Sequence, residues 1–206
     1  MKVYYIWDAY CGWCYGFDKI LAPFMKAHPE LELDMISGGL FTGGNEKTTR
    51  QLGAYDTMNE EIAQRYGVEF GEAFKATFTQ DLPVDSLRAA QAFGVLRRYI
   101  PQEEQVALAY RMQQAFYEKG QLLSDLETYE NVIGEFDLDP IILLPEVATA
   151  WQSRAPHPDF RRARELGVTS YPTLILEKDG RYYDLRGQAQ TVEELEATYQ
   201  SLLHLD

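Results

Sequence analysis

The sequence predicts an α/β fold in which a βαβ unit and a ββα unit are separated by a long helical block. Two observations support this prediction. Short apolar and β-branched runs occur near the two ends of the chain, at residues 3–7, 31–36, 173–177 and 182–185. From about Asn45 to Arg164 such runs vanish, and apolar residues recur at helical spacing between glycine, proline and capping residues. The sheet is therefore expected to form from segments that are distant in sequence.

The N-terminal segment predicts a strand, a short loop, a helix and a second strand. Val3 to Trp7 is rich in β-forming residues, and apolar residues at positions 17, 21 and 24 then recur at helical spacing. Pro23 lies inside this helical pattern and is expected to kink the helix or end it early, because proline lacks the N–H group that a helix needs. Leu31 to Ile36 alternates well enough to predict the second strand.

The central block, residues 45–164, is predicted to be a helical insertion into a discontinuous domain formed by residues 1–44 and 165–206. Two of its helices carry apolar stripes, which are more typical of packing faces than of cofactor sites. The stripes are Ala89, Phe93, Leu96 and Ile100, and Val106, Ala109, Met112 and Phe116. Ser124 and Glu127 form a capping-box pattern before a third helix.

Strand patterns return in the C-terminal segment. Two short runs, Thr173–Glu177 and Tyr182–Leu185, flank Lys178-Asp179-Gly180-Arg181, whose Asp-Gly pair predicts a hairpin turn. Thr191 and Glu194 form a capping box ahead of a final amphipathic helix.

The composition argues against nucleic-acid binding and against a membrane-spanning segment. The formal net charge is -13, from 19 Lys plus Arg and 32 Asp plus Glu residues, so the field of the chain repels a phosphate backbone. No apolar run approaches the roughly 18 residues of a membrane span. The N-terminal sequence shows neither a basic segment nor an apolar segment of signal length, so we expect a cytoplasmic protein. Hydrophobic residues make up 46% of the 206-residue chain, which is enough to form a core without disulfides or metal.

The motif Cys11-Gly12-Trp13-Cys14 carries the chemistry. Two thiols three residues apart at the start of a helix lie on one face, close enough to form a reversible disulfide. Unpaired N–H groups and the positive end of the helix dipole stabilise a thiolate at the first position, so Cys11 is predicted to be the nucleophile. Cys14, one turn further in, is predicted to be less exposed and to resolve the mixed disulfide. In a cytosolic chain, a spaced cysteine pair is more often functional than structural.

A zinc site is the structural alternative for this cysteine pair. Structural zinc usually takes four protein ligands, and the chain has no second cysteine pair. His28, His157 and His204 are far apart in sequence and lack ligand spacing. No metal is therefore expected, and each histidine is more often a surface or packing residue.

A glycine-rich segment, Gly38-Gly39-Leu40-Phe41-Thr42-Gly43-Gly44, follows the second predicted strand. It lacks the Lys-Ser/Thr pair of a phosphate-binding loop and the spacing of a dinucleotide site, so nucleotide binding is not expected. Two interpretations are open. The glycines satisfy positive φ angles or a close backbone approach, or Gly38, Gly39 and Leu40 form one wall of a substrate groove.

The segment Val168-Thr169-Ser170-Tyr171-Pro172-Thr173 leads into the third predicted strand, and its proline removes a ladder donor at the start of the strand, where a sheet tolerates the loss. Together with Cys11-Gly12-Trp13-Cys14-Tyr15-Gly16 and Gly38-Gly39-Leu40, this segment resembles the DsbA-like family of thioredoxin-fold oxidoreductases, and more narrowly its cytosolic predicted protein-disulfide isomerase branch. The resemblance spans nearly the whole chain. It implies a thioredoxin-like fold and a loop of Tyr171, Pro172 and Thr173 with a cis Tyr171–Pro172 bond beside Cys11, the Tyr171 backbone pairing with extended substrate. Ser170 stands where the family often has glycine, which predicts a stiffer loop.

These observations predict a thiol-disulfide oxidoreductase or isomerase that exchanges disulfides with a protein or a low-molecular-weight thiol. No cofactor is expected beyond the redox-active disulfide, with glutathione as a candidate co-substrate. Two alternatives are open. A glutathione-dependent transferase or isomerase of the same fold would not need the resolving Cys14, and a redox-sensing adaptor would need neither thiol for binding. The physiological substrate, the direction of exchange and the oligomeric state do not follow from the sequence.

Overall fold

A four-stranded mixed sheet forms the centre of the fold, in a computed structural model that describes residues 1–205. Its strands are β1 (Lys2–Trp7), β2 (Glu32–Ser37), β5 (Thr173–Lys178) and β6 (Arg181–Asp184). The order is β2-β1-β5-β6, with β1 and β2 parallel and the other two pairs antiparallel. Parallel neighbours need a crossover, which helix α1 (Gly12–Ala27) provides.

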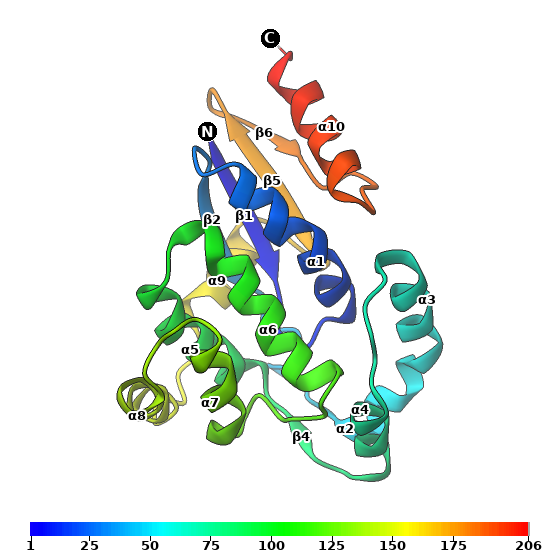
Figure 1. Ribbon diagram of the computed structural model, residues 1–206, viewed down its shortest axis with the longest axis vertical. Helices are drawn as coiled ribbons and strands as arrows, with labels where there is room; N and C mark the ends of the chain where they lie inside the picture. The colour runs from blue at the N-terminus through cyan, green and yellow to red at the C-terminus, as the bar shows by residue number, and fades with distance from the viewer. Residues whose placement is uncertain (206) are drawn as a thin grey trace.

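Helices make up most of the remaining described chain. They are α2 (Thr49–Leu52), α3 (Asp56–Tyr66), α4 (Glu72–Ala76), α5 (Ser86–Leu96), α6 (Gln105–Tyr117), α7 (Leu126–Gly134), α8 (Pro140–Ala150), α9 (Pro158–Glu165) and α10 (Val192–Leu203). Short 3-10 turns lie at Gly53–Tyr55, Thr77–Thr79, Arg97–Tyr99 and Gln102–Glu104. Figure 1 shows α2, α4, α5, α7 and α8 at the end of the molecule opposite the two labelled termini.

Helices cover both faces of the sheet. On the face of α1 and α10, Val3 and Tyr5 are fully buried in the main core. On the opposite face, Ile6 and Ile36 form a smaller buried cluster with Ala163 of α9. Alternate residues of β1 therefore pack against different helices, as period-two side chains of a central strand do. All but the last residue of α9 falls in the predicted helical block, residues 45–164, yet this helix packs on the sheet.

The β5–β6 hairpin turns at Asp179 and Gly180. Their φ angles are 53° and 74°, and Lys178 pairs with Arg181 across the ladder. Positive φ at both central residues is the type I′ geometry, which favours an Asp-Gly pair. The predicted hairpin is confirmed, and its strand ends differ from the predicted ones by a residue.

Two regions differ from the sequence-based expectation. A two-residue ladder joins β3 (Lys47–Thr48) to β4 (Pro83–Val84) inside the block predicted to lack strands. The sequence did not predict these strands, because two residues are too few to show an alternating pattern. Helix α1 continues past Pro23 to Ala27, so it does not end early. Phe24 and Met25 follow the proline and are fully buried, and their packing holds the last turn of the helix.

The helix starts and apolar stripes agree with the predictions in part. The stripes over residues 89–96 of α5 and 106–116 of α6 are buried, and Ile100 is half-buried just beyond α5. Thr191 caps α10 by accepting the Glu194 N–H, as predicted. The capping box predicted from Ser124 is wrong, because Asp125 is the N-cap of α7 and its side chain makes no capping bond.

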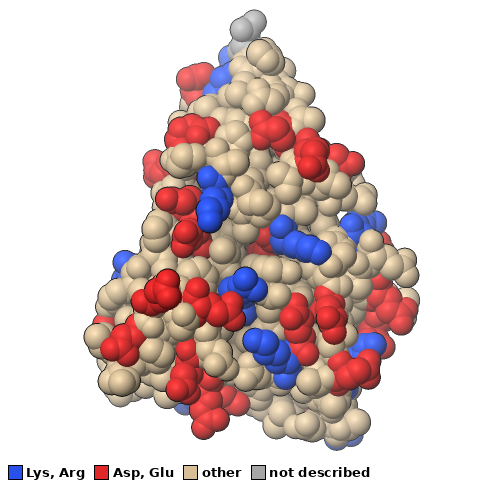
Figure 2. Space-filling model, in the orientation of Figure 1, with Lys and Arg blue, Asp and Glu red and all other residues tan. Residues whose placement is uncertain are grey.

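Acidic side chains are spread over the face shown in Figure 2, with basic side chains scattered among them. The net charge of -13 is thus not offset on this face by an extended basic surface. None of the helices within residues 1–205 is long and apolar enough to cross a bilayer.

Candidate active site

Cys11 occupies the N-cap of α1, in the loop that follows β1. Its Sγ accepts a hydrogen bond from the Cys14 N–H at 3.3 Å, and its own N–H donates to the Asp8 carbonyl at 3.1 Å. The thiol also donates to the Tyr171 carbonyl, with a sulfur–oxygen distance of 3.7 Å. A sulfur at this position faces the first N–H groups of the helix and the positive end of its dipole.

Cys14 lies one turn into α1, with no exposed surface, whereas Cys11 is 7% exposed. Both thiols are free, so the structure represents the dithiol form. Burial raises the pKa of the Cys14 thiol well above its usual range, and the hydrogen bond and charge of Cys11 raise it further. Of the two sulfurs, Cys11 is therefore the one that a substrate can approach.

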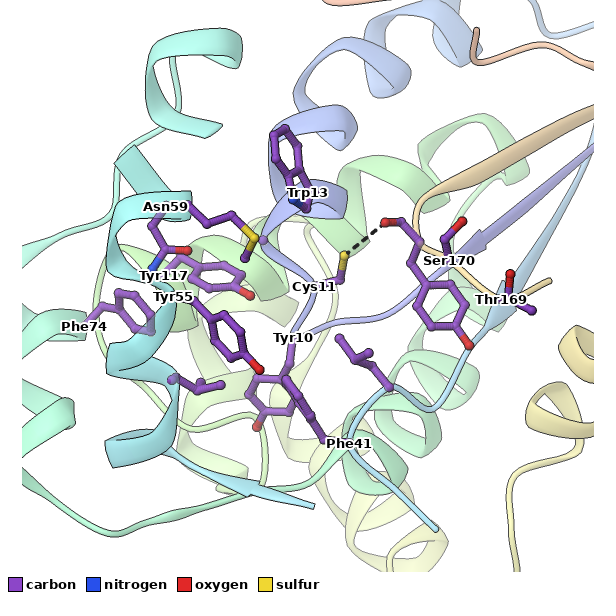
Figure 3. Close-up of a pocket in the computed structure, with 15 residues that line it drawn as sticks. Tyr10, Cys11, Trp13, Phe41, Tyr55, Asn59, Phe74, Tyr117, Thr169 and Ser170 are labelled. Carbon is purple, nitrogen blue, oxygen red and sulfur yellow. Dashed lines mark hydrogen bonds between the residues drawn. The ribbon is translucent and has the colours of Figure 1, made fainter. Parts of the chain in front are cut away.

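The Tyr171–Pro172 peptide bond is cis, and the Tyr171 carbonyl faces Cys11 Sγ (Figure 3). The Tyr171 hydroxyl donates to the Gly38 carbonyl at 3.0 Å, which joins this loop to the glycine segment after β2. A Cβ atom at Gly38 would lie 2.3 Å from the Tyr171 ring, and one at Gly39, where φ is +73°, would lie 2.8 Å from Phe160. Close approach therefore accounts for both glycines.

Asp8 connects the segments around Cys11. Its carboxylate is 2% exposed and accepts hydrogen bonds from the Tyr10 N–H at 3.0 Å, the Leu40 N–H at 2.8 Å and the Ser86 hydroxyl at 3.0 Å. Burial raises the pKa of Asp8, and these donors oppose the rise. The carboxylate thus sets the positions of the loop before α1, the glycine segment and the start of α5 relative to one another.

Asp18 is a second buried carboxyl group, one turn after Cys14 on α1. The Tyr5 hydroxyl donates to Asp18 Oδ1, whereas Oδ2 has no hydrogen-bond partner. Burial raises the pKa of Asp18 well above its usual range, and the bond from Tyr5 opposes the rise. The charge of Asp18 in turn raises the pKa of Cys14, so the two groups are electrostatically coupled.

A cavity of about 270 Å³ opens beside Cys11, between the start of α1 and the α2–α4 segment (Figure 3). Aromatic residues dominate its lining, among them Tyr10, Trp13, Phe41, Tyr55, Phe74 and Tyr117. The lining within residues 1–205 includes no Asp, Glu, Lys, Arg or His. The cavity therefore favours an apolar or aromatic group, because a buried charge without a partner is costly.

The two residues between the cysteines differ in role. Trp13 is half-buried and lines the cavity, and the Arg65 guanidinium lies over its ring, 5.1 Å from the ring centroid. Gly12 lets α1 approach α3, because a Cβ atom there would lie 3.1 Å from Ile62 Cδ1. Trp13 therefore offers contact area to a substrate, and Gly12 sets helix packing.

The structure brings together most of the residues singled out from the sequence. The cavity lining includes Cys11, Gly12, Trp13, Leu40 and Tyr171. Pro172 is buried, and Thr173 begins β5 with its hydroxyl donating to the Ser170 carbonyl at 2.8 Å. Gly38 and Gly39 lie outside the cavity lining.

None of the described histidines lines the cavity at Cys11. No group of three or more His, Cys, Asp and Glu residues within residues 1–205 is arranged to hold a metal ion. His28 lies between Glu30 and Glu196, with ring nitrogen to oxygen distances of 2.8 and 2.7 Å. His157 caps α9 by accepting the Asp159 N–H.

Solved structures of known proteins match the chain over its whole length. The cytosolic disulfide reductase DsbM from Pseudomonas aeruginosa matches with a TM-score of 0.80 at 24% identity, covering 100% of both chains. The chain has a DsbA-like fold. DsbM with GSH matches at a TM-score of 0.76 and 21% identity, again over 100% of both chains. A candidate protein disulfide isomerase from Nitrosomonas europaea matches at 0.74 and 20%, covering 98% of this chain and 97% of that one.

No family model matches the chain, and the comparison with curated proteins finds no match either. The fold prediction, a thioredoxin-like α/β fold with a large helical insertion, is confirmed by the sheet topology and by these structures.

Sequence reasoning missed four contributors to the site of this DsbA-like fold: Asp8, Asp18, Phe41 and the α2–α4 segment. Asp18 has one signal, because it shares the buried face of α1 with Cys14 at a spacing of one turn. Asp8 has none, because Leu40 and Ser86 lie 32 and 78 positions away along the chain.

Proposed function

We propose that the chain is a thiol-disulfide oxidoreductase in which Cys11 attacks and Cys14 resolves. The arrangement of the two thiols at the start of α1 carries this proposal. Cys11 faces the apolar cavity, whereas Cys14 has no exposed surface and is reached through Cys11. The likeness in fold to a cytosolic disulfide reductase supports it.

In the reductive direction, the Cys11 thiolate attacks one sulfur of a substrate disulfide and displaces the other sulfur as a thiolate. Cys14 then loses its proton and attacks Cys11 Sγ, which releases the second substrate thiolate and closes the Cys11–Cys14 disulfide. Two electrons pass from the pair to the substrate, and two equivalents of a thiol such as glutathione restore the dithiol. Burial raises the pKa of Asp18 and so brings it closer to the pKa of a thiol. A proton can therefore pass more readily from the Cys14 thiol to the Asp18 carboxylate.

The contacts of Cys11 favour reduction or isomerisation over net oxidation. Strong oxidants of this fold owe their potential to a stabilised reduced form. Here the hydrogen bonds described for Cys11 Sγ are one from the Cys14 N–H and one to the Tyr171 carbonyl, with no cation among the partners. A cytoplasmic reductase that draws electrons from glutathione fits this arrangement, and the structure of DsbM with GSH supports the choice of reductant.

Trapping variants test the division of roles. Cys14→Ser should accumulate mixed disulfides on Cys11 when the protein is mixed with a peptide disulfide, whereas Cys11→Ser should accumulate few. Mass spectrometry of alkylated samples measures both species. Equal trapping by the two variants would remove the assignment.

The same variants separate the alternative functions. A glutathione-dependent transferase would keep its activity in Cys14→Ser, and an adaptor would keep its binding in the double variant Cys11→Ser/Cys14→Ser. The reduction potential of the cysteine pair, measured at equilibrium in glutathione buffers, then indicates the direction of exchange. Reduction potentials of this fold range from about -270 mV for a reductant to about -120 mV for an oxidant.

A further inference from the structure

A second cavity adjoins the one at Cys11. It encloses about 460 Å³ and shares Phe41 with the Cys11 cavity. Its lining includes three cations, namely Lys47 on β3, Arg154 in the segment between α8 and α9, and Arg164 on α9. We call this second cavity the cation cleft.

The three cations of the cation cleft are unusual in this chain. The net charge is -13, and most Lys and Arg side chains that the structure describes form ion pairs or hydrogen bonds, such as Arg162 with Asp34 at 2.6 Å. Within residues 1–205, Lys47, Arg154 and Arg164 form neither. The lining thus holds three cations against two carboxylates, Glu46 and Asp85, an excess of positive charge in an acidic protein that attracts an anion.

The carboxylates of the cation cleft are already engaged by backbone groups. Glu46 accepts the Gly44 N–H at 3.2 and 3.0 Å from its two oxygens. Asp85 Oδ1 caps α5 by accepting the Leu87 N–H at 2.9 Å and the Arg88 N–H at 3.2 Å. Asp85 Oδ2 also lies 3.8 Å from Arg88 Nε. These contacts hold the two carboxylates to the loop, to the helix start and to Arg88, and neither carboxylate forms an ion pair with Lys47, Arg154 or Arg164 within residues 1–205.

The cation cleft and the Cys11 cavity meet at Phe41, which lines both. The residue before it, Leu40, lines the Cys11 cavity, and the residue after it, Thr42, lines the cation cleft. A small molecule that extends past Phe41 would therefore reach from the Cys11 cavity into the cation cleft.

We infer that the cation cleft binds the carboxylate of a small, anionic thiol or disulfide whose sulfur and apolar part lie in the Cys11 cavity. The inference rests on the proposed function and narrows its substrate class to carboxylate-bearing low-molecular-weight thiols. The lining of the Cys11 cavity has no charged side chain, whereas that of the cation cleft has an excess of cations, and both volumes are in the range of small-molecule sites.

A thioether probe tests this site without any redox step. S-benzylglutathione carries an apolar group on sulfur and two carboxylates, and its diethyl ester lacks the carboxylate charges. We expect calorimetry to show that the acid binds the wild-type chain at least tenfold more tightly than the ester. Arg154→Gln and Arg164→Gln should each weaken binding of the acid by about tenfold, which is the scale of one charge-assisted hydrogen bond, and leave the ester unchanged.

Lys26→Gln is the matched control. The side chain of Lys26 also makes no hydrogen bond or ion pair within residues 1–205, but it lines a different hollow near the end of α1. Its removal changes the net charge by the same amount, so affinity for the acid should stay within twofold of wild type. An equal loss in Lys26→Gln, equal binding of acid and ester, or no binding of the acid to the wild type would overturn the inference.

The outcome also separates this inference from the proposed function, because the probe undergoes no thiol exchange. A chain that binds the acid selectively but traps no mixed disulfide in Cys14→Ser would refute the proposed function alone. A chain that traps mixed disulfides but binds acid and ester equally would refute the cation cleft alone.

Discussion

Cys14 and Asp18 lie one turn apart on α1, and both side chains are fully buried. Each becomes negatively charged when it loses its proton, and burial raises the pKa of both groups. Neighbouring buried groups of this kind do not ionise together, so the proton is shared between the two sites. In the proposed mechanism, Asp18 therefore holds the proton while Cys14 attacks the mixed disulfide.

Asp18→Asn is expected to slow the resolving step. Asparagine keeps the shape and still accepts the Tyr5 hydroxyl, but it cannot take a proton from Cys14. Release of a mixed disulfide from Cys11 should slow about 100-fold near pH 7, and less at higher pH, where solvent removes the Cys14 proton. Quenched-flow mass spectrometry measures this rate, with the first attack by Cys11 as the internal control. A rate equal to wild type across the pH range would rule out the role.

The same variant should be more stable than wild type, and the sign follows from the proton balance. Burial raises the pKa of Asp18 in the folded chain above its unfolded value of about 3.9, so folding takes up a proton between the two values. The stability that depends on this group is complete below the unfolded pKa and is lost as pH rises toward the folded pKa. Urea unfolding should show a gain for Asp18→Asn of at least about 1.4 kcal/mol at pH 7.5, the equivalent of one pKa unit, and little gain at pH 4.

Helices α1 and α3 approach each other closely because glycines of α1 face α3. A Cβ atom at Gly16 would lie 2.4 Å from the Tyr66 ring and 2.9 Å from Ile62. Helix α3 carries Met58 and Asn59, which line the Cys11 cavity. The distance between the two helices therefore sets the width of this cavity.

Gly16→Ala is expected to displace α3 from α1. Overpacking should destabilise the chain by roughly 1–3 kcal/mol, which exceeds the gain of about 1 kcal/mol from the higher helix propensity of alanine. The KM for an apolar small disulfide should rise as Met58 and Asn59 move. Gly134→Ala on α7 is the control, because an added Cβ atom there meets nothing within 4 Å and should stabilise by up to about 1 kcal/mol. Equal stabilisation by both variants in urea unfolding would contradict the close packing.

At the scale of the whole molecule, Asp8 links parts of the chain that meet through folding alone. Its carboxylate accepts from the Leu40 N–H and the Ser86 hydroxyl, and its carbonyl accepts the Cys11 N–H. The reactive loop is thereby held to the glycine segment and to the start of α5. Both carboxylate oxygens are bonded, in contrast to Asp18.

Replacing aspartate by asparagine is therefore expected to destabilise the chain at position 8, whereas it is expected to stabilise the chain at position 18. Asp8→Asn places an NH2 group against backbone donors and should destabilise the chain by about 2–3 kcal/mol, with slower attack by Cys11. Asp81→Asn is the control, because Asp81 is 66% exposed with one ion pair at 3.8 Å, and it should change stability by less than about 0.5 kcal/mol. Chemical denaturation and thiol alkylation rates measure both effects. A stabilised Asp8→Asn variant would refute the linking role.

Sequence alone predicted the features whose physical cause lies within one or two turns of chain. The Asp179-Gly180 turn follows from two positive φ angles, and the cap at Thr191 follows from a bond across three residues. The Cys11 and Cys14 pair is likewise defined by helical spacing. The sequence left the role of Gly38 and Gly39 open. The aromatic rings that these glycines contact, those of Tyr171 and Phe160, are far away in sequence.

Tertiary structure decided the surroundings of the thiols. Asp8, Ser86 and Tyr171 meet near Cys11 because the helical block and the sheet bury a common apolar core. That burial is the sum of many small, non-directional contacts, and no local pattern records which distant residues it brings together. Phe41 likewise lies between the Cys11 cavity and the cation cleft only after β2, α3 and α9 have packed, so the proposed carboxylate site follows from the fold and not from the cysteine motif.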